Sequence, residues 1–292
     1  MVLRNRNLLG LIYMTPALLF VAAFVLYPFG QLIYTSFTDT SLLGGGQWVG
    51  LANYTKIFIG DPQFWRSLSF TAKYTAIITP ILMGLGYALA LLTVGNTSVL
   101  RFARAVIFMP VVVGLGTSSL LWYWLFNQQV GLFDRALVDL HITDRMIVWF
   151  ISADWGLWAV IISVTWKVVG FGMILFIAAI QSISHEIIEA SQMDGASYWR
   201  RVQLIYLPLT FRTVLLVTLI SAIGSMLAFE QFYILTGGNP RGQTFSSVYL
   251  IYQSAFVKFQ LGYGSALSVV LTATIMIGAA AQIYLTGRSG KP

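Results

Sequence analysis

The sequence predicts an all-α membrane protein with six transmembrane helices. Of its 292 residues, 58% are apolar and only 9% are charged. The mean hydropathy is +0.79. A soluble globular domain has about a quarter of its residues charged, which is far more than this chain offers to water. The composition therefore excludes a soluble enzyme, a disordered chain and a nucleic-acid-binding domain.

Long uncharged runs locate the six spans, because a helix needs roughly 20 apolar residues to cross a bilayer. The first run follows Arg4 and Arg6, but it is longer than the apolar part of a signal peptide, so we expect an uncleaved first span. The spans are predicted at 9–36, within 74–100, within 105–133, within 155–183, from 213 past Glu230, and within 259–287.

Basic residues near the spans predict the orientation. Nine of them lie in the N-terminus, the connections 95–104 and 184–212, and the C-terminus, against seven in the other connections. The nine also sit in short segments, where this rule operates. Both termini and the loop 184–212 are therefore placed in the cytoplasm. On the outer side, residues 134–154 mix charged and apolar residues and predict a short interfacial helix.

The residues of catalytic and cofactor sites are missing from the sequence. It contains no phosphate-binding loop and no dinucleotide-binding glycine pattern. It has no cysteine, which excludes disulfides and thiolate metal sites. His185 and Glu186 begin a zinc-protease pattern, but Glu189 stands where that pattern needs its second histidine. We expect no catalytic residue, no metal site and no cofactor in this chain.

The loop 184–208 carries the most information. Ser184 can cap a helix over 185–193, and Gly195 follows where a left-handed residue often ends a helix. A second helix over 197–206 leads to Pro208. The small residues of the loop allow another surface to approach closely. By physics alone, the segment is either a docking helix beneath the membrane or an ordinary connection.

The same loop resembles the EAA loop of ABC-importer permeases, in which E-A-A-x-x-D-G-A precedes I-x-L-P. The matching residues are Glu189, Ala190, Asp194, Gly195, Ala196, Ile205, Leu207 and Pro208. Ser191 stands where the family commonly has alanine, which is a conservative change. Other segments resemble carbohydrate-importer permeases of the MalF-like half of the pair: 48–54, 101–110, 181–183, 235–240 and 262–266.

The resemblance implies a type I ABC importer permease fold in a bacterial inner membrane. It divides the chain into a first helix with its outer loop, 1–65, and a permease core, 66–288. It further implies a second and different permease chain, two ATPase subunits that bind ATP and Mg, and an extracytoplasmic binding protein that delivers a small solute. Membrane lipid surrounds such a chain, and no nucleic acid partner is expected.

The residues that would couple to the ATPase are Glu189, Ala190, Ser191, Asp194, Gly195 and Ala196. Asp194 could equally cap the turn between the two loop helices.

Two charges inside the predicted spans are candidates for a transport role, because charged residues in a membrane are costly. Lys167 and Glu230 either pair with each other, line a helix interface or serve the solute path. In the family the solute-facing surfaces lie on spans four and five, and the candidates there are Val164, Lys167, Val168, Phe171, Ser221, Gly224, Ser225 and Ala228. The alternative function is a stand-alone secondary transporter that uses Lys167 and Glu230.

Overall fold

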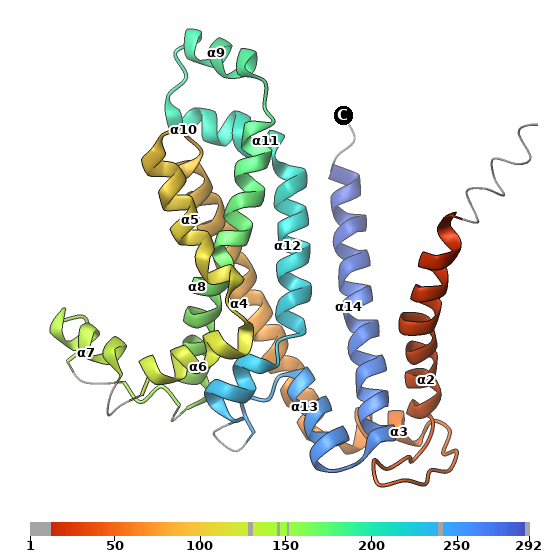
Figure 1. Cartoon of the computed structure of the whole chain (residues 1–292). Coiled ribbons are helices and arrows are strands. Elements are labelled where there is room, and N and C mark those ends of the chain that lie inside the picture. The colour runs from red at the N-terminus through yellow and green to blue at the C-terminus, as the bar shows by residue number, and fades with distance from the viewer. Residues whose placement is uncertain (1–12, 128–130, 145–146, 151, 239–241, 290–292) are drawn as a thin grey trace, which may run out of the picture. The chain divides into compact units, whose positions relative to one another are not determined.

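The computed structural model describes residues 13–127, 131–144, 147–150, 152–238 and 242–289. Within these ranges the regular elements are helices, joined by two isolated β-bridges. Figure 1 shows the helices along the chain. The chain divides into two compact units, Met1–Phe64 with Leu250–Thr274 and Trp65–Tyr249 with Ile275–Pro292. Each unit is described by itself.

The first unit begins with the helix Tyr13–Ser36, which is long and apolar enough to cross a membrane. It contains the π-helical turn η1 (Ala22–Leu26) and α2 (Tyr27–Ser36). Most of its large apolar side chains are exposed, as expected for a helix in lipid. The helix confirms the first predicted span, except that residues 9–12 lie outside the described residues.

A short helical segment, α3 (Ala52–Thr55) with η2 (Lys56–Gly60), anchors the end of α2. The Asn53 amide donates to the carbonyls of Ser36 at 2.9 Å and Thr38 at 2.8 Å. The last carbonyls of a helix lack partners within it, so Asn53 supplies donors where the backbone cannot.

The second stretch of the first unit, Leu250–Thr274, contains the end of α13 (Ser247–Tyr252), η5 (Gln253–Val257) and the first part of α14 (Leu261–Ser289). Backbone bonds from Leu42 to Phe259 and from Gly262 to Thr40 fasten the loop after α2 to the start of α14. α14 confirms the sixth predicted span as a long apolar helix.

The second unit packs α4 (Pro62–Thr93), α5 (Ser98–Val112), α8 (Ala153–Gln181) and α12 (Phe211–Met226) around a buried apolar cluster. Tyr87 meets Phe176 edge to face at a centroid distance of 5.0 Å. Its hydroxyl lies 3.0 Å from the Thr210 Oγ1 atom. The cluster consists of Tyr87, Ala90, Met173, Phe176, Ile177, Ile180 and Val217. α8 confirms the fourth predicted span.

The second predicted span starts too late in the chain. α4 begins at Pro62 and ends at Thr93, whereas the uncharged run starts at residue 74. The Asp61 carboxylate accepts the Gln63 backbone N–H at 2.9 Å, and proline suits a first helical turn. These local signals start the helix before Arg66 and Lys73. A search for uncharged runs excludes both residues and therefore places the start of the span too late.

The third predicted span is not one straight helix. α5 ends at Val112, and α6 (Leu115–Leu125) leaves it at an angle of 100°. Pro110 lies in the last turn of α5, and Val113 and Gly114 are extended. A proline in the last turn and a glycine just after it end the helix. The apolar run itself continues without a charge. The described residues contain four helices that could cross a membrane, or up to six if each bent pair is one span.

The fifth predicted span is shorter than expected. α12 ends at Met226, so Glu230 lies beyond it, just before the π-helical turn η4 (Phe232–Thr236). A short amphipathic helix, α7 (Leu132–Asp139), overlaps the helix predicted within 134–154. Its position at a membrane surface stays a prediction.

Candidate functional site

The loop after α8 folds as two helices joined by a tight turn. α9 (His185–Met193) confirms the first loop helix at its predicted bounds. Gly195 has a φ of +71°, and the amides of Gly195 and Ala196 donate to Gln192 and Ser191, each at 3.0 Å. This pair of bonds is the Schellman ending, which requires a left-handed residue. Figure 1 shows α9 beyond the ends of α8 and α10.

Two details of the loop differ from the prediction. Ser184 occupies the N-cap position of α9, but its side chain makes no capping hydrogen bond. The second helix does not end at 206. It runs through α10 (Tyr198–Arg201), η3 (Val202–Tyr206) and α11 (Leu207–Leu209), and bends by 69° into α12. Ser197 caps its start, and a π-helical stretch carries it up to Pro208.

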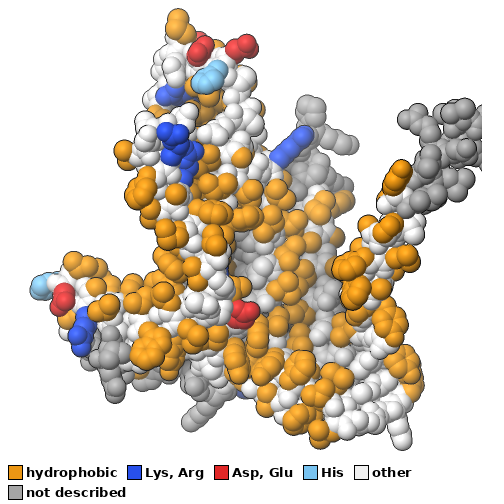
Figure 2. Space-filling view, in the orientation of Figure 1, with side chains coloured by type: hydrophobic (Ala, Val, Ile, Leu, Met, Phe, Trp, Pro, Cys, Tyr) orange, Lys and Arg blue, Asp and Glu red, His pale blue; other side chains and the backbone are white. Residues whose placement is uncertain are grey.

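The predicted coupling residues fall into an exposed and a buried set. Glu189, Ala190, Asp194 and Gly195 are exposed and Ala196 is half-buried. Ser191 is buried, and its hydroxyl donates to the Ile188 carbonyl at 2.6 Å. Figure 2 shows acidic side chains and a histidine over α9. Met193 is 89% exposed, which leaves a large apolar side chain uncovered beside this acidic surface.

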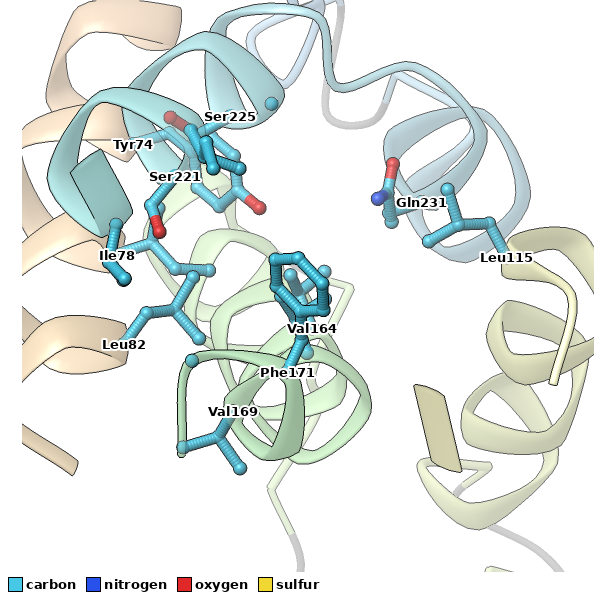
Figure 3. Close-up of a pocket in the computed structure, with 15 residues that line it drawn as sticks. Tyr74, Ile78, Leu82, Leu115, Val164, Val169, Phe171, Ser221, Ser225 and Gln231 are labelled. Carbon is cyan, nitrogen blue, oxygen red and sulfur yellow. The ribbon is translucent and has the colours of Figure 1, made fainter. Parts of the chain in front are cut away.

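A cavity of about 210 Å³ lies between α4, α8 and α12. The structure brings Phe171, Ser221 and Ser225 together in its wall, and their role in a solute path stays a prediction. Figure 3 shows Phe171 between Ser221 on one side and Gln231 with Leu115 on the other. The full lining is Tyr74, Ile78, Leu82, Leu115, Val164, Val168, Val169, Phe171, Gly172, Val217, Ile220, Ser221, Gly224, Ser225 and Gln231.

The two serines of α12 differ in their hydrogen bonds. Ser225 donates to the Thr75 hydroxyl at 3.0 Å and to the Ala222 carbonyl at 2.9 Å. Among the described residues, Ser221 makes no hydrogen bond. Ser221 therefore offers a free hydroxyl to whatever enters the cavity, whereas Ser225 already bridges α12 and α4.

Lys167 and Glu230 lie apart from this lining. The Lys167 ammonium donates to the backbone carbonyls of Pro110, Val111 and Val113. Glu230 is exposed. The two charges attract each other through space, but the described residues form no ion pair between them. Of the alternatives for Lys167, its contacts correspond to a helix interface, because the ammonium binds the end of α5.

Sequence reasoning missed Tyr74, Leu115 and Gln231 in the cavity wall. Tyr74 and Gln231 are 1% and 8% exposed, respectively. Gln231 directly follows Glu230, and two adjacent polar residues at the end of an apolar run were the available signal. Leu115 could not be found, because only the break between α5 and α6 turns it toward the cavity. The described residues hold no cluster of metal-ligating side chains.

Comparison with known proteins assigns the fold and the family. Residues 76–288 match the family model described as "Binding-protein-dependent transport system inner membrane component". The sulfoquinovosyl glycerol transport system permease protein SmoG of Agrobacterium fabrum is 32% identical over 272 residues, which cover 92% of this chain and 87% of that protein. The lactose transport system permease protein LacF of Rhizobium radiobacter is 28% identical, covering 94% and 93% of the two chains.

The fold also matches a solved transporter. A chain in the crystal structure of a bacterial alginate ABC transporter, in complex with its periplasmic protein bound to an alginate pentasaccharide, superposes with a TM-score of 0.86. The alignment covers 98% of this chain and 96% of that chain at 18% identity. At this identity the likeness concerns the fold.

Proposed function

Because the chain belongs to the family of binding-protein-dependent transport system inner membrane components, we propose that it is one permease subunit of an ATP-driven importer for a carbohydrate or a related solute. It is a multi-pass protein of the inner membrane. Some of its relatives are named for sulfoquinovosyl glycerol, starch degradation products or lactose, and others for sn-glycerol-3-phosphate. In the importer it works beside a second, different permease chain, two ATPase subunits and a binding protein outside the cytoplasm.

The exposed surface of α9 is the observation that carries this proposal. Glu189 and Asp194 lie on it without a hydrogen-bond partner among the described residues, next to the exposed Met193. Charged and large apolar side chains left uncovered on a short helix suit a protein partner. The chain has no phosphate-binding loop, so ATP and Mg would bind to the ATPase subunits. Asp194 is assigned to partner contact, since the turn donates no hydrogen bond to its carboxylate.

The cavity between α4, α8 and α12 supports a solute path for uncharged groups. Its lining contains no charged side chain. Phe171 offers a ring for the apolar face of a sugar, and Ser221 and Gln231 offer polar atoms. Such a mix of apolar walls and few polar groups is typical of small-molecule sites. A stand-alone secondary transporter would instead need Lys167 and Glu230 as a coupling pair, and they form no ion pair.

The test is co-purification of the tagged permease with its ATPase subunits, followed by measurement of ATP hydrolysis. The double variant Glu189→Ala, Gly195→Pro should lose the ATPase or its stimulation. Asp144→Ala is the matched control, since it removes an exposed carboxylate from a different loop. Equal recovery of the ATPase with the double variant and with wild type would contradict the assignment of α9. Failure of the wild type to bind an ATPase would contradict the importer itself.

A further inference from the structure

The break between α5 and α6 is held by a buried lysine from a third helix. Lys167 on α8 is 7% exposed. Its ammonium donates to the carbonyl oxygens of Pro110 at 3.4 Å, Val111 at 3.2 Å and Val113 at 2.5 Å. These three carbonyls belong to the last turn of α5 and the residue that follows it.

The chemistry of a helix end explains why a lysine suits this place. The last carbonyls of a helix have no partner within it, and they carry the negative end of the helix dipole. An ammonium group has three donors, and here each one has an acceptor. Lys167 therefore has no donor left for a solute, and a buried charge of this kind is stable only while its hydrogen bonds persist.

The backbones of α5 and α8 approach closely beside this contact. A Cβ atom placed on Gly170 would lie 2.5 Å from the Ile107 carbonyl oxygen and 2.9 Å from the Phe108 Cα atom. Only glycine fits there, one turn from Lys167. The lysine consequently reaches the carbonyls of α5 from a rigidly packed neighbour.

An acidic residue stands at the other side of the break. A Cβ atom placed on Gly116, in the first turn of α6, would lie 3.8 Å from the Glu230 Oε2 atom. A carboxylate near a helix N-terminus is favourable, and the N-cap residue of α6, Gly114, has no side chain to fill that role. Lys167 and Glu230 thus each oppose the helix end of complementary charge.

We infer that Lys167 and Glu230 are positioning residues that hold the α5–α6 break and thereby set Leu115 in the cavity wall. They are neither solute contacts nor an ion-coupling pair. Leu115 lies two residues after Val113, whose carbonyl accepts a hydrogen bond from Lys167, and it lines the cavity. The effect on uptake rests on the proposed function, whereas the effect on Leu115 does not.

The test uses the absence of cysteine from the chain. Leu115→Cys places a single thiol at the break, and its rate of reaction with N-ethylmaleimide is measured on the full chain in native membranes. Leu115 is 39% exposed in the wall, so its thiol reacts at a measurable rate in the otherwise wild-type chain. Adding Lys167→Met should change this rate by up to about tenfold, since the break loses the hydrogen bonds of a charged group and Leu115 takes a different position. Lys167→Arg should restore most of the wild-type rate. Ser163→Ala is the control, because Ser163 is buried on the same helix and, within the described part of the chain, bonds only to the Val160 carbonyl.

Two further variants keep the inference open to contradiction. Glu230→Gln changes an exposed residue to one of nearly the same shape and should change the rate by a smaller amount. The reversed pair, Lys167→Glu with Glu230→Lys, should be at least as impaired as Lys167→Met, because a carboxylate at 167 would face carbonyl oxygens. Unchanged labelling in Lys167→Met, or recovery in the reversed pair, would overturn the positioning role. Neither readout needs transport, so failure of the importer assignment would be recognised separately.

Discussion

The loop helix α9 and the cavity between α4, α8 and α12 belong to the same unit but are built on opposite principles. α9 is a local structure, since its bounds and its turn depend on residues 184–197 alone. The cavity is assembled from helices that lie far apart in the sequence. The loop leaves most of its candidate coupling residues exposed, whereas the candidate solute contacts line the wall of a cavity. We therefore expect changes in the loop to affect coupling, and changes in the cavity to affect the solute.

Gly195→Val should give the largest effect on the loop side. The φ of Gly195 is +71°, and a Cβ atom there would meet nothing within 4 Å. The penalty is therefore conformational, of about 1–2 kcal/mol for a side chain in the left-handed region, and larger for a β-branched one. We expect solute-stimulated ATP hydrolysis to fall roughly tenfold, because α9 changes direction relative to α10.

Gly195→Asn is the control for this prediction. Asparagine tolerates the left-handed conformation, so the variant should keep most of the coupled hydrolysis. Equal losses with valine and asparagine would show that the position acts through contact with the side chain of the partner and not through the turn.

Phe171→Ala should give the largest effect on the cavity side. The ring is 39% exposed and stands in the cavity wall. Loss of an aromatic face for a sugar ring should raise the half-saturating solute concentration for uptake about threefold to tenfold. Basal ATP hydrolysis should stay near wild type. The measurement is uptake in proteoliposomes that contain the complete importer.

Ile174→Ala is the matched control for Phe171→Ala. Ile174 lies on the same helix and is 38% exposed, but it is not part of this cavity wall. The control should leave the half-saturating concentration unchanged. A similar shift in both variants would indicate that α8 responds as a whole, and would remove Phe171 from the solute path.

The sequence predicts the loop better than the cavity for a physical reason. α9, Gly195 and the spans at α8 and α14 follow from local signals, namely a capping position, a left-handed glycine and apolar length. Pro110 and Gly114 are local signals for the break, but the contact of its carbonyls with Lys167 joins residues more than fifty positions apart in the chain. Apolar length alone predicts a single span within 105–133, and it does not determine which way Leu115 faces. The same limit explains why the sequence leaves open whether Lys167 pairs with Glu230, lines a helix interface or serves the solute path.

The two serines of α12 should give the smallest effects and the sharpest comparison within the cavity. Ser221→Ala removes a hydroxyl that has no partner among the described residues, so the protein should keep its stability while uptake weakens by a few-fold, the worth of one hydrogen bond to a solute. Ser225→Ala breaks the bond to Thr75 between α12 and α4. It should lower the free energy of unfolding by about 1 kcal/mol and change solute affinity less. Thermal unfolding and uptake, measured on both variants in parallel, distinguish these outcomes. If Ser225→Ala weakened uptake more than Ser221→Ala at unchanged stability, Ser225 and not Ser221 would be the hydroxyl that meets the solute.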